Sequence, residues 1–358
     1  MSRKITLPIF VLFILVVVLY LLRGSLAMPI FERVLPKMMG ADIRDELADG
    51  LNVGVCGAGG PLPDPRRSGA CIAVMAGETL LVVDTGTGGA RNITRMQIPL
   101  GQIDAVLLTH FHSDHIDGLG ELATLRWVGA ANTSPLPVIG PSGVRQVVEG
   151  FNLAYQQDTV YRHDHHGDTV APLSGKGLVA APFAPPADGQ GEVVWDKDGL
   201  KVTAFRVIHD PVKPAVGYRF DYAGRSVVIS GDTAPSKNLE AFAKGADLLF
   251  HEALSRKFVG AMENAAKQTG NKIIEKITFD IQDYHTSPTE AAASATTAGV
   301  GHLAFYHIVP PLILPGSEQA FLEGVDDVYD GPTTLTRDGA LFSLPAGSSD
   351  ILVVKEGL

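Results

Sequence analysis

The chain has few cysteines, few charged residues and no run of basic residues longer than a pair. Cys56 and Cys71 are its only cysteines among 358 residues, which excludes a disulfide-rich scaffold and a zinc finger. Lysine and arginine total 29 against 39 aspartates and glutamates, a formal net charge of −10. Nucleic-acid binding needs basic clusters that neutralise phosphate, and the sequence offers only pairs such as Arg66-Arg67. The composition therefore argues against nucleic acid as the main partner.

The two cysteines lie in neighbouring predicted strands, 51–56 and 71–74. In an oxidising compartment they could pair if their Cα atoms came within about 7 Å of each other. Cysteine is also a common small residue of protein cores. We therefore expect two buried free thiols, with a disulfide as the alternative.

Charge is also absent from the apolar stretch Leu7 to Leu22, which follows Arg3 and Lys4. This length lies at or just below the range of about 17 to 25 residues for a membrane span. A signal peptide is the alternative, with small residues near Ala27 as a cleavage site. We predict an anchor or signal peptide over residues 1–27 and a hydrolase domain over 45–358. That domain would be anchored at the inner membrane or exported to the periplasm or cell exterior.

Short apolar runs alternate with helical patterns through the rest of the chain. Strands are expected at 51–56, 71–75, 79–83, 103–109, 137–139, 201–208, 216–222, 225–230, 246–250 and 302–306. Helices are expected near 89–97, 116–127, 142–156, 236–244, 254–269 and 288–299. This interleaving fits an α+β sandwich of two sheets flanked by helices.

The densest chemical cluster follows the apolar run Ile103 to Leu108, in the segment Thr109-His110-Phe111-His112-Ser113-Asp114-His115. Three of the chain's 11 histidines fall within six positions there. Neutral imidazole and carboxylate are the nitrogen and oxygen donors that Zn²⁺ takes in hydrolytic sites. The segment therefore predicts a metal-binding loop at the end of a buried strand.

This H-x-H-x-D-H pattern resembles the metallo-β-lactamase superfamily of binuclear metal hydrolases. Three later segments match that family in order: Val207-Ile208-His209-Asp210, Ser230-Gly231-Asp232-Thr233 and Leu303-Ala304-Phe305-Tyr306-His307. Asp84 matches a position that usually does not ligate metal. The resemblance covers about residues 50 to 345 and implies a four-layer αββα sandwich.

The resemblance also implies a ligand set for two Zn²⁺ ions per chain. His110, His112 and His209 would hold the first ion, and Asp114, His115 and His307 the second. Asp232 would bridge the two ions. Such a pair lowers the pKa of a coordinated water from ~15.7 to about 7, which supplies a nucleophile at neutral pH. Asp114 is thus counted among the catalytic residues as well as among the metal ligands.

Two further segments, Phe250-His251-Glu252-Ala253 and Tyr284-His285-Thr286-Ser287, resemble the branch containing ribonuclease Z and the metal-dependent arylsulfatases. In that branch His285 would assist the leaving group and Glu252 would fix its tautomer. Ser287 also suits the N-cap of a helix starting at Pro288. Both roles can hold together.

The expected function is a binuclear zinc hydrolase of small anionic esters, with an aryl sulfate or phosphodiester as substrate. The alternatives are a ribonuclease Z-like tRNA 3′-endonuclease and a carboxylester or lactone hydrolase on the same metals. A ribonuclease Z normally carries an extended substrate arm, and no basic arm is recognisable here. A homodimer is the default assembly.

A second histidine group, Tyr161-Arg162-His163-Asp164-His165-His166, lies between the metal motifs. A third metal site there is less favoured than a solvated loop. Arg162 and Tyr161 are expected to bind the anionic substrate, since arginine suits an anionic ester group.

Overall fold

The computed structural model describes residues 3–358 and divides into two compact units. The first ends at Asp45, and the second is Glu46–Leu358.

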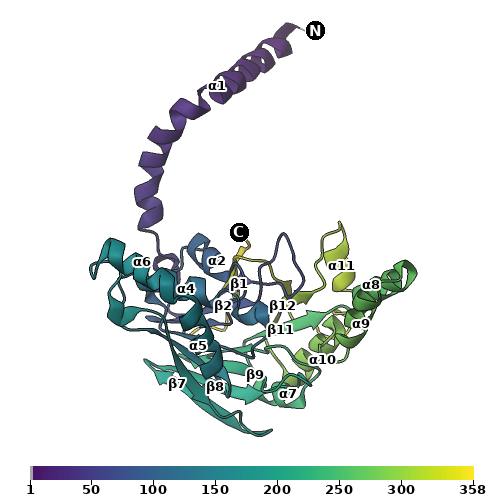
Figure 1. The fold of residues 1–358 in the computed structure, drawn as a ribbon. Helices are drawn as coiled ribbons and strands as arrows, with labels where there is room; N and C mark the ends of the chain where they lie inside the picture. The colour runs from purple at the N-terminus through teal and green to yellow at the C-terminus, as the bar shows by residue number, and fades with distance from the viewer. Residues whose placement is uncertain (1–2) are drawn as a thin grey trace. The chain divides into compact units, whose positions relative to one another are not determined.

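The first unit is dominated by one long helix, α1 (Arg3–Met39), drawn in purple in Figure 1. Its segment Leu12–Lys37 is long and apolar enough to cross a membrane, with a mean hydropathy of 2.1. A signal sequence near the N-terminus would meet the same criteria. The helix runs past Ala27, the end of the predicted anchor or signal peptide.

The second unit contains two mixed β-sheets. The eight-stranded sheet has the order β15 (Leu352–Glu356), β14 (Ala340–Pro345), β1 (Gly50–Gly57), β2 (Cys71–Ala76), β3 (Thr79–Val83), β4 (Ala105–Leu107), β5 (Leu136–Pro141) and β6 (Leu178–Phe183). The seven-stranded sheet has the order β13 (Thr333–Leu335), β12 (His302–Val309), β11 (Leu248–Leu254), β10 (Arg225–Ile229), β9 (Val216–Tyr222), β8 (Leu200–Arg206) and β7 (Gly191–Lys197).

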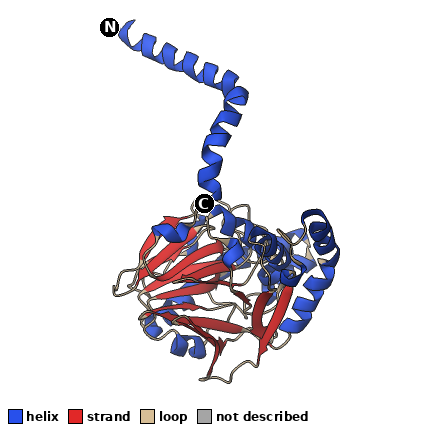
Figure 2. Ribbon diagram, turned by 90° about the vertical axis from the view of Figure 1, so that its left-hand side faces the viewer, coloured by secondary structure: helices blue, strands red, loops and turns tan. Residues whose placement is uncertain are grey.

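Helices flank both sheets (Figure 2). They are α2 (Gly89–Arg95), α3 (Ser113–Ile116), α4 (Leu119–Gly129), α5 (Val144–Ala154), α6 (Gln156–His166), α7 (Lys237–Phe242), α8 (Arg256–Thr269), α9 (Lys272–Asp280), α10 (Pro288–Ala298) and α11 (Ser317–Phe321). Helices α2 and α5 pack on the eight-stranded sheet, whereas α7 and α10 pack on the seven-stranded sheet.

The main core lies between the two sheets. Inward-facing side chains such as Val53 and Val74 of the first sheet join Phe220 and Phe250 of the second in one buried cluster. The rings of Phe250 and Phe342 meet edge to face across the interface, with centroids 5.3 Å apart. Because each sheet buries one face against the other and one against helices, the layers follow the αββα order. The expected sandwich is confirmed.

The cysteines differ from expectation. Cys56 and Cys71 form a disulfide, with their Cα atoms 4.9 Å apart. Strands β1 and β2 are antiparallel, and a register shift between Val55 and Gly57 sets Gly57 opposite Cys71. This irregularity brings Cys56 next to Cys71, so the prediction of free thiols is wrong. A bulge of this kind cannot be recognised from strand patterns.

Candidate metal centre

The candidate metal-ligand motifs lie after or near the carboxyl ends of strands that point to one edge of the sandwich, with His307 among the last residues of β12 (His302–Val309). Strands β3 and β4 are parallel neighbours in one sheet. Strands β10, β11 and β12 are parallel neighbours in the other. Segments distant in sequence therefore deliver their first polar residues to the same edge.

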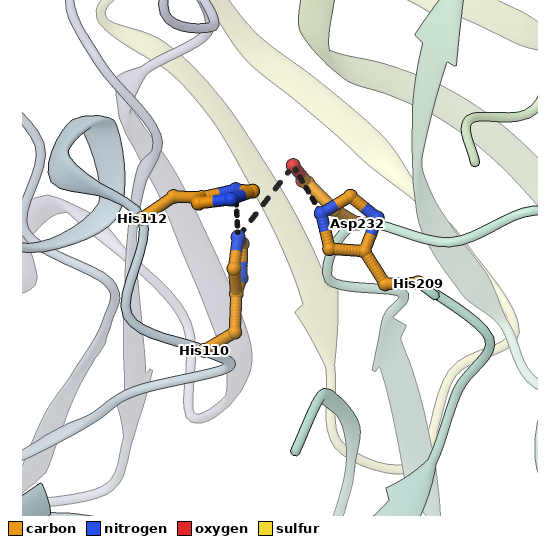
Figure 3. A group of neighbouring side chains, drawn as sticks. All are labelled: His110, His112, His209 and Asp232. Atoms are coloured by element: carbon orange, nitrogen blue, oxygen red, sulfur yellow. Dashed lines mark hydrogen bonds and ion pairs between the residues drawn. The ribbon is translucent and has the colours of Figure 1, made fainter. Parts of the chain in front are cut away.

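One donor group consists of His110, His112, His209 and Asp232, whose candidate ligand atoms all lie within 4.8 Å of one another. His110 Nε2 lies 3.0 Å from His112 Nδ1. Asp232 Oδ2 lies 3.8 Å from His110 Nε2 and 3.9 Å from His209 Nε2. Figure 3 shows the two histidines of the loop after β4 facing His209 and Asp232.

A second donor group consists of Asp114, His115 and His307. His307 Nε2 lies 3.0 Å from Asp114 Oδ2, and His115 Nε2 lies 3.5 Å from the same oxygen. Asp232 Oδ2 is also 3.4 Å from His115 Nε2 and 3.3 Å from His307 Nε2. Asp232 therefore lies between the two groups.

These donors fit a pair of metal ions. Nitrogen and oxygen ligands 2.0–2.1 Å from a tetrahedral ion lie about 3.3 Å apart, close to the separations observed here. Several buried donor atoms also have no hydrogen-bond partner: His115 Nε2, His209 Nε2, Asp232 Oδ1 and His307 Nδ1. Buried polar atoms without partners are costly. Cations bound at Nε2 of His115 and His209 would remove that cost for these two atoms.

Other polar groups orient the ligands. Asp84 Oδ2 lies 2.8 Å from His115 Nδ1, and its carboxylate also accepts hydrogen bonds from the backbone and hydroxyl of Thr109. His209 Nδ1 lies 3.0 Å from the carbonyl oxygen of Tyr284. A contact at Nδ1 fixes the ring and directs Nε2 toward the donor cluster. The sequence pattern identified Asp84 but not the carbonyl of Tyr284.

Strained backbone accompanies these ligands. Asp84 and His307 have φ values of 56° and 46°, a region that non-glycine residues rarely adopt and that clusters at functional sites. A Cβ atom on Gly86 would lie 2.3 Å from the carbonyl oxygen of Asp114. Glycine at this position therefore permits the close approach of the loop after β3 to the ligand loop.

Electrostatic interactions shift the pKa values of the cluster in different directions. Burial lowers the pKa of His110 well below its ordinary value, and His115 lowers it further. Burial also opposes protonation of His115, but Asp232 and Asp84 raise its pKa well above the ordinary value. Burial alone would raise the pKa of Asp232, yet His307 and His115 hold it well below its usual range. Asp232 is thus an anion among imidazoles, as a bridging ligand would need to be.

Comparison with known proteins agrees with this geometry. Residues 79–308 match the family model described as a β-lactamase superfamily domain. A ribonuclease Z of Mycobacterium bovis is 38% identical over 273 residues, covering 75% of this chain and 89% of that protein. A ribonuclease Z of Mycobacterium marinum is 35% identical over 277 residues, with coverages of 75% and 90%. The chain belongs to the metallo-β-lactamase superfamily, in its ribonuclease Z branch.

Solved structures of the superfamily share the fold. Human tRNase Z, short form, has a TM-score of 0.58 at 20% identity, covering 82% of this chain and 99% of that one. A diphosphatase from the PhnP family has a TM-score of 0.57 at 19% identity, with coverages of 83% and 99%. With the donor set above, membership identifies the protein as a metal-dependent hydrolase acting on ester bonds.

The pair expected from the ribonuclease Z branch lies beside the donors. His285 Nδ1 is 3.0 Å from Glu252 Oε1, which also accepts hydrogen bonds from the backbone of Thr233 and Thr286. The His285 ring stacks near His307, with centroids 5.7 Å apart. Ser287 caps α10 with a complete capping box, so its structural role coexists with the placement of His285.

A pocket of about 320 Å³ opens on the metal-binding groups. Its polar lining includes His112, Asp114, Asp232 and His285, while helices α8 and α9 supply an apolar wall. We expected the first of these helices, near 254–269, but not the second, at 272–280, so the wall was not anticipated.

The second histidine group lies elsewhere. Residues 156–166 form helix α6, where we expected an irregular segment. Arg162 pairs with Asp158, Tyr161 is 64% exposed, and neither belongs to the lining of the metal pocket. The structure thus gives no contact between these two residues and the metal cleft. Among the described residues, the metal-binding groups include none of the histidines at 163–166.

Proposed function

We propose that this protein hydrolyses phosphodiester bonds with two divalent metal ions. The observation that carries the proposal is the convergence of six further donors around Asp232, in a chain whose relatives are named ribonuclease Z. Zinc is the favoured metal because the donors are imidazoles and carboxylates.

The roles proposed for the individual residues are those that the resemblance implies. One ion would be held by His110, His112 and His209, and the other by Asp114, His115 and His307, with Asp232 between them. When bound, two such ions activate a water at neutral pH and stabilise charge on the ester oxygens. The anionic Asp232 reduces the repulsion between the two cations.

His285 would assist departure of the leaving group. As water adds to phosphorus and loses a proton, the bond to the leaving oxygen breaks and that oxygen takes the Nε2 proton of His285, which would act in its doubly protonated form and keep its Nδ1 proton toward Glu252. The contact between Nδ1 and Glu252 supports this role, because it orients the ring with Nε2 available. Glu252 is fully buried and acts as a positioning residue.

The substrate has two candidate classes. The names of the relatives favour the alternative of a tRNA 3′-endonuclease over the aryl sulfate, which receives no support from the comparisons. They also oppose the expectation that nucleic acid is not a partner. A small phosphodiester is the second candidate, favoured by the net charge of −10 and by the limited volume of the pocket.

The location bears on this choice. Disulfides persist in oxidising compartments, so the Cys56–Cys71 bond supports an exported domain. The apolar helix α1 fits either an anchor or a signal sequence. Localisation of a tagged full-length chain by membrane fractionation and protease accessibility would test the export proposal. A cytosolic chain with reduced cysteines would contradict it.

Activity is tested with full-length, zinc-loaded protein. We expect about two zinc equivalents per chain and turnover of bis(p-nitrophenyl) phosphate, with p-nitrophenyl sulfate and a lactone as comparison substrates. A precursor tRNA assay in parallel separates the two substrate classes. Turnover of the lactone without any phosphodiester cleavage would overturn the proposal.

A further inference from the structure

The apolar wall of the metal pocket comes from the hairpin of helices α8 and α9, which pack side by side (Figure 1). The wall consists of Met262, Ile274, Ile277 and Ile281, and Val309 at the end of strand β12 extends it. The same pocket contains Asp114 and His285. An apolar surface therefore borders the groups assigned to the reaction.

This wall remains open to solvent. Ile274, Ile277 and Ile281 recur at intervals of three and four, which places them on one face of the helix and its C-terminal extension. Ile274 is 38% exposed and Ile277 is 46% exposed. Isoleucines on the inner face of a helix are usually covered by the core. Here they border a pocket, which leaves their apolar area available to a ligand.

The hairpin offers little free positive charge. Each of its five cations pairs with a carboxylate of the described chain. The pairs are Arg256 with Glu290, Lys257 with Glu323, Lys267 with Glu263, Lys272 with Glu275, and Lys276 with Asp280. Tracking a nucleic-acid backbone requires cations that neutralise phosphates. The pairing reduces the positive charge that the hairpin offers to a phosphate backbone.

The size of the pocket agrees with a small ligand. A volume of about 320 Å³ lies at the lower end of the range for small-molecule sites, about 300–1,000 Å³. Such sites combine a mainly apolar lining with a few polar groups that fix orientation. Here the metal-binding groups and His285 supply the polar part.

We infer that the α8–α9 hairpin selects phosphodiesters that carry an alkyl or aryl group, with Ile274 and Ile277 as specificity-determining residues. The inference rests on the proposed function and narrows it to small substrates. The phosphate would lie at the metal-binding groups, and the apolar group against the isoleucines.

The test measures competitive inhibition of bis(p-nitrophenyl) phosphate hydrolysis by methyl, butyl, hexyl and phenyl phosphate. We expect the inhibition constant to fall at least about tenfold from methyl to hexyl phosphate, because each buried methylene adds several-fold to affinity. Phenyl phosphate distinguishes an aryl from an alkyl preference. In Ile277→Ser the dependence on chain length should be largely lost.

Phe279→Ser is the matched control, since Phe279 is on the same helix, 65% exposed and outside the pocket lining. It should keep the full dependence on chain length. Equal inhibition by all four phosphates, or strong competition by precursor tRNA without any effect of chain length, would overturn the inference while leaving phosphodiester hydrolysis intact. If no phosphodiester is hydrolysed, the proposed function fails. Calorimetry with the same four phosphates would then still show whether binding affinity rises with the length of the alkyl group, as the apolar wall requires.

Discussion

The two sides of the metal pocket are built by different means. One side is the edge of the sandwich, where strand ends hold fully or largely buried histidines and aspartates in a dense hydrogen-bonded set. The other side is the α8–α9 hairpin, whose pocket-facing isoleucines are partly exposed. The comparison suggests that the strand ends fix the reaction, whereas the hairpin determines which molecule undergoes it.

The largest effect is expected at the strand-end side, in Asp232→Ala. Asp232 is the donor shared by both metal-binding groups, and its loss leaves two cations without an anion between them. Metal ions contribute several kcal/mol to such reactions, so kcat/KM should fall by about 1,000-fold or more. Metal analysis should show a lower zinc content. A variant with normal zinc content and normal turnover would contradict the role of Asp232.

His285 lines the pocket together with donors from the strand ends and isoleucines from the hairpin, and His285→Ala tests its role in the reaction. We expect kcat to fall by about 100-fold, the usual contribution of a general acid, with zinc content unchanged. The loss should be smaller for p-nitrophenyl esters than for alkyl esters, because a good leaving group needs less protonation.

Glu252→Gln accompanies this variant, since it removes the negative charge that contacts Nδ1 of His285 while keeping the size of the side chain. The pH profile of kcat should shift in Glu252→Gln, whereas the metal affinity should not. An unchanged pH profile would contradict the proposal that Glu252 positions His285 and would leave Glu252 with a structural role only.

Asp84→Asn should have an intermediate effect. Asp84 contacts Nδ1 of His115 and the backbone of Thr109, and loss of such an orienting group costs about 10–100-fold in metal affinity. Competition with a chelator would measure it. Turnover at saturating zinc should recover much of its value, which separates Asp84 from the ligands themselves.

The smallest effect is expected for the anchoring of the hairpin, in Glu290→Gln. Burial alone would raise the pKa of Glu290, but hydrogen bonds from Ser287 and Arg256 lower it. A lowered folded-state pKa stabilises the protein above the unfolded value of 4.5, and this contribution disappears as pH falls through the folded value. Glu290→Gln should therefore reduce unfolding free energy by about 0.5–1 kcal/mol at pH 7.

The difference between Glu290→Gln and the wild type should vanish toward pH 3, as urea unfolding at several pH values would show. Turnover should change little, because Glu290 lies outside the pocket lining. A difference that grew on acidification would refute this account of Glu290.

Much of the sandwich was predictable because its strands are locally distinctive. Strand β9 spans Val216–Tyr222, as expected, and β10 differs by one residue at its end. Both are apolar runs bounded by a turn at Ala223-Gly224. Strand β7 was missed because Gly191–Lys197 is an exposed edge strand whose apolar residues are consecutive and do not alternate with polar ones. Helix α9 was missed although its signal is present, since Ile274, Ile277 and Ile281 recur at helical spacing and Asn271 caps the helix.

The sequence by itself determined the donor types and their order, because histidine and aspartate directly after β-branched runs mark the ends of strands. The placement of Asp232 among the histidines was expected from the resemblance. Only the tertiary structure decided that Cys56 meets Cys71. It also decided that α9 lines the pocket, whereas the helix carrying Tyr161 and Arg162 does not. The physical reason is that local patterns encode local backbone conformation. Which surfaces meet depends on sheet register and packing between residues far apart in the chain.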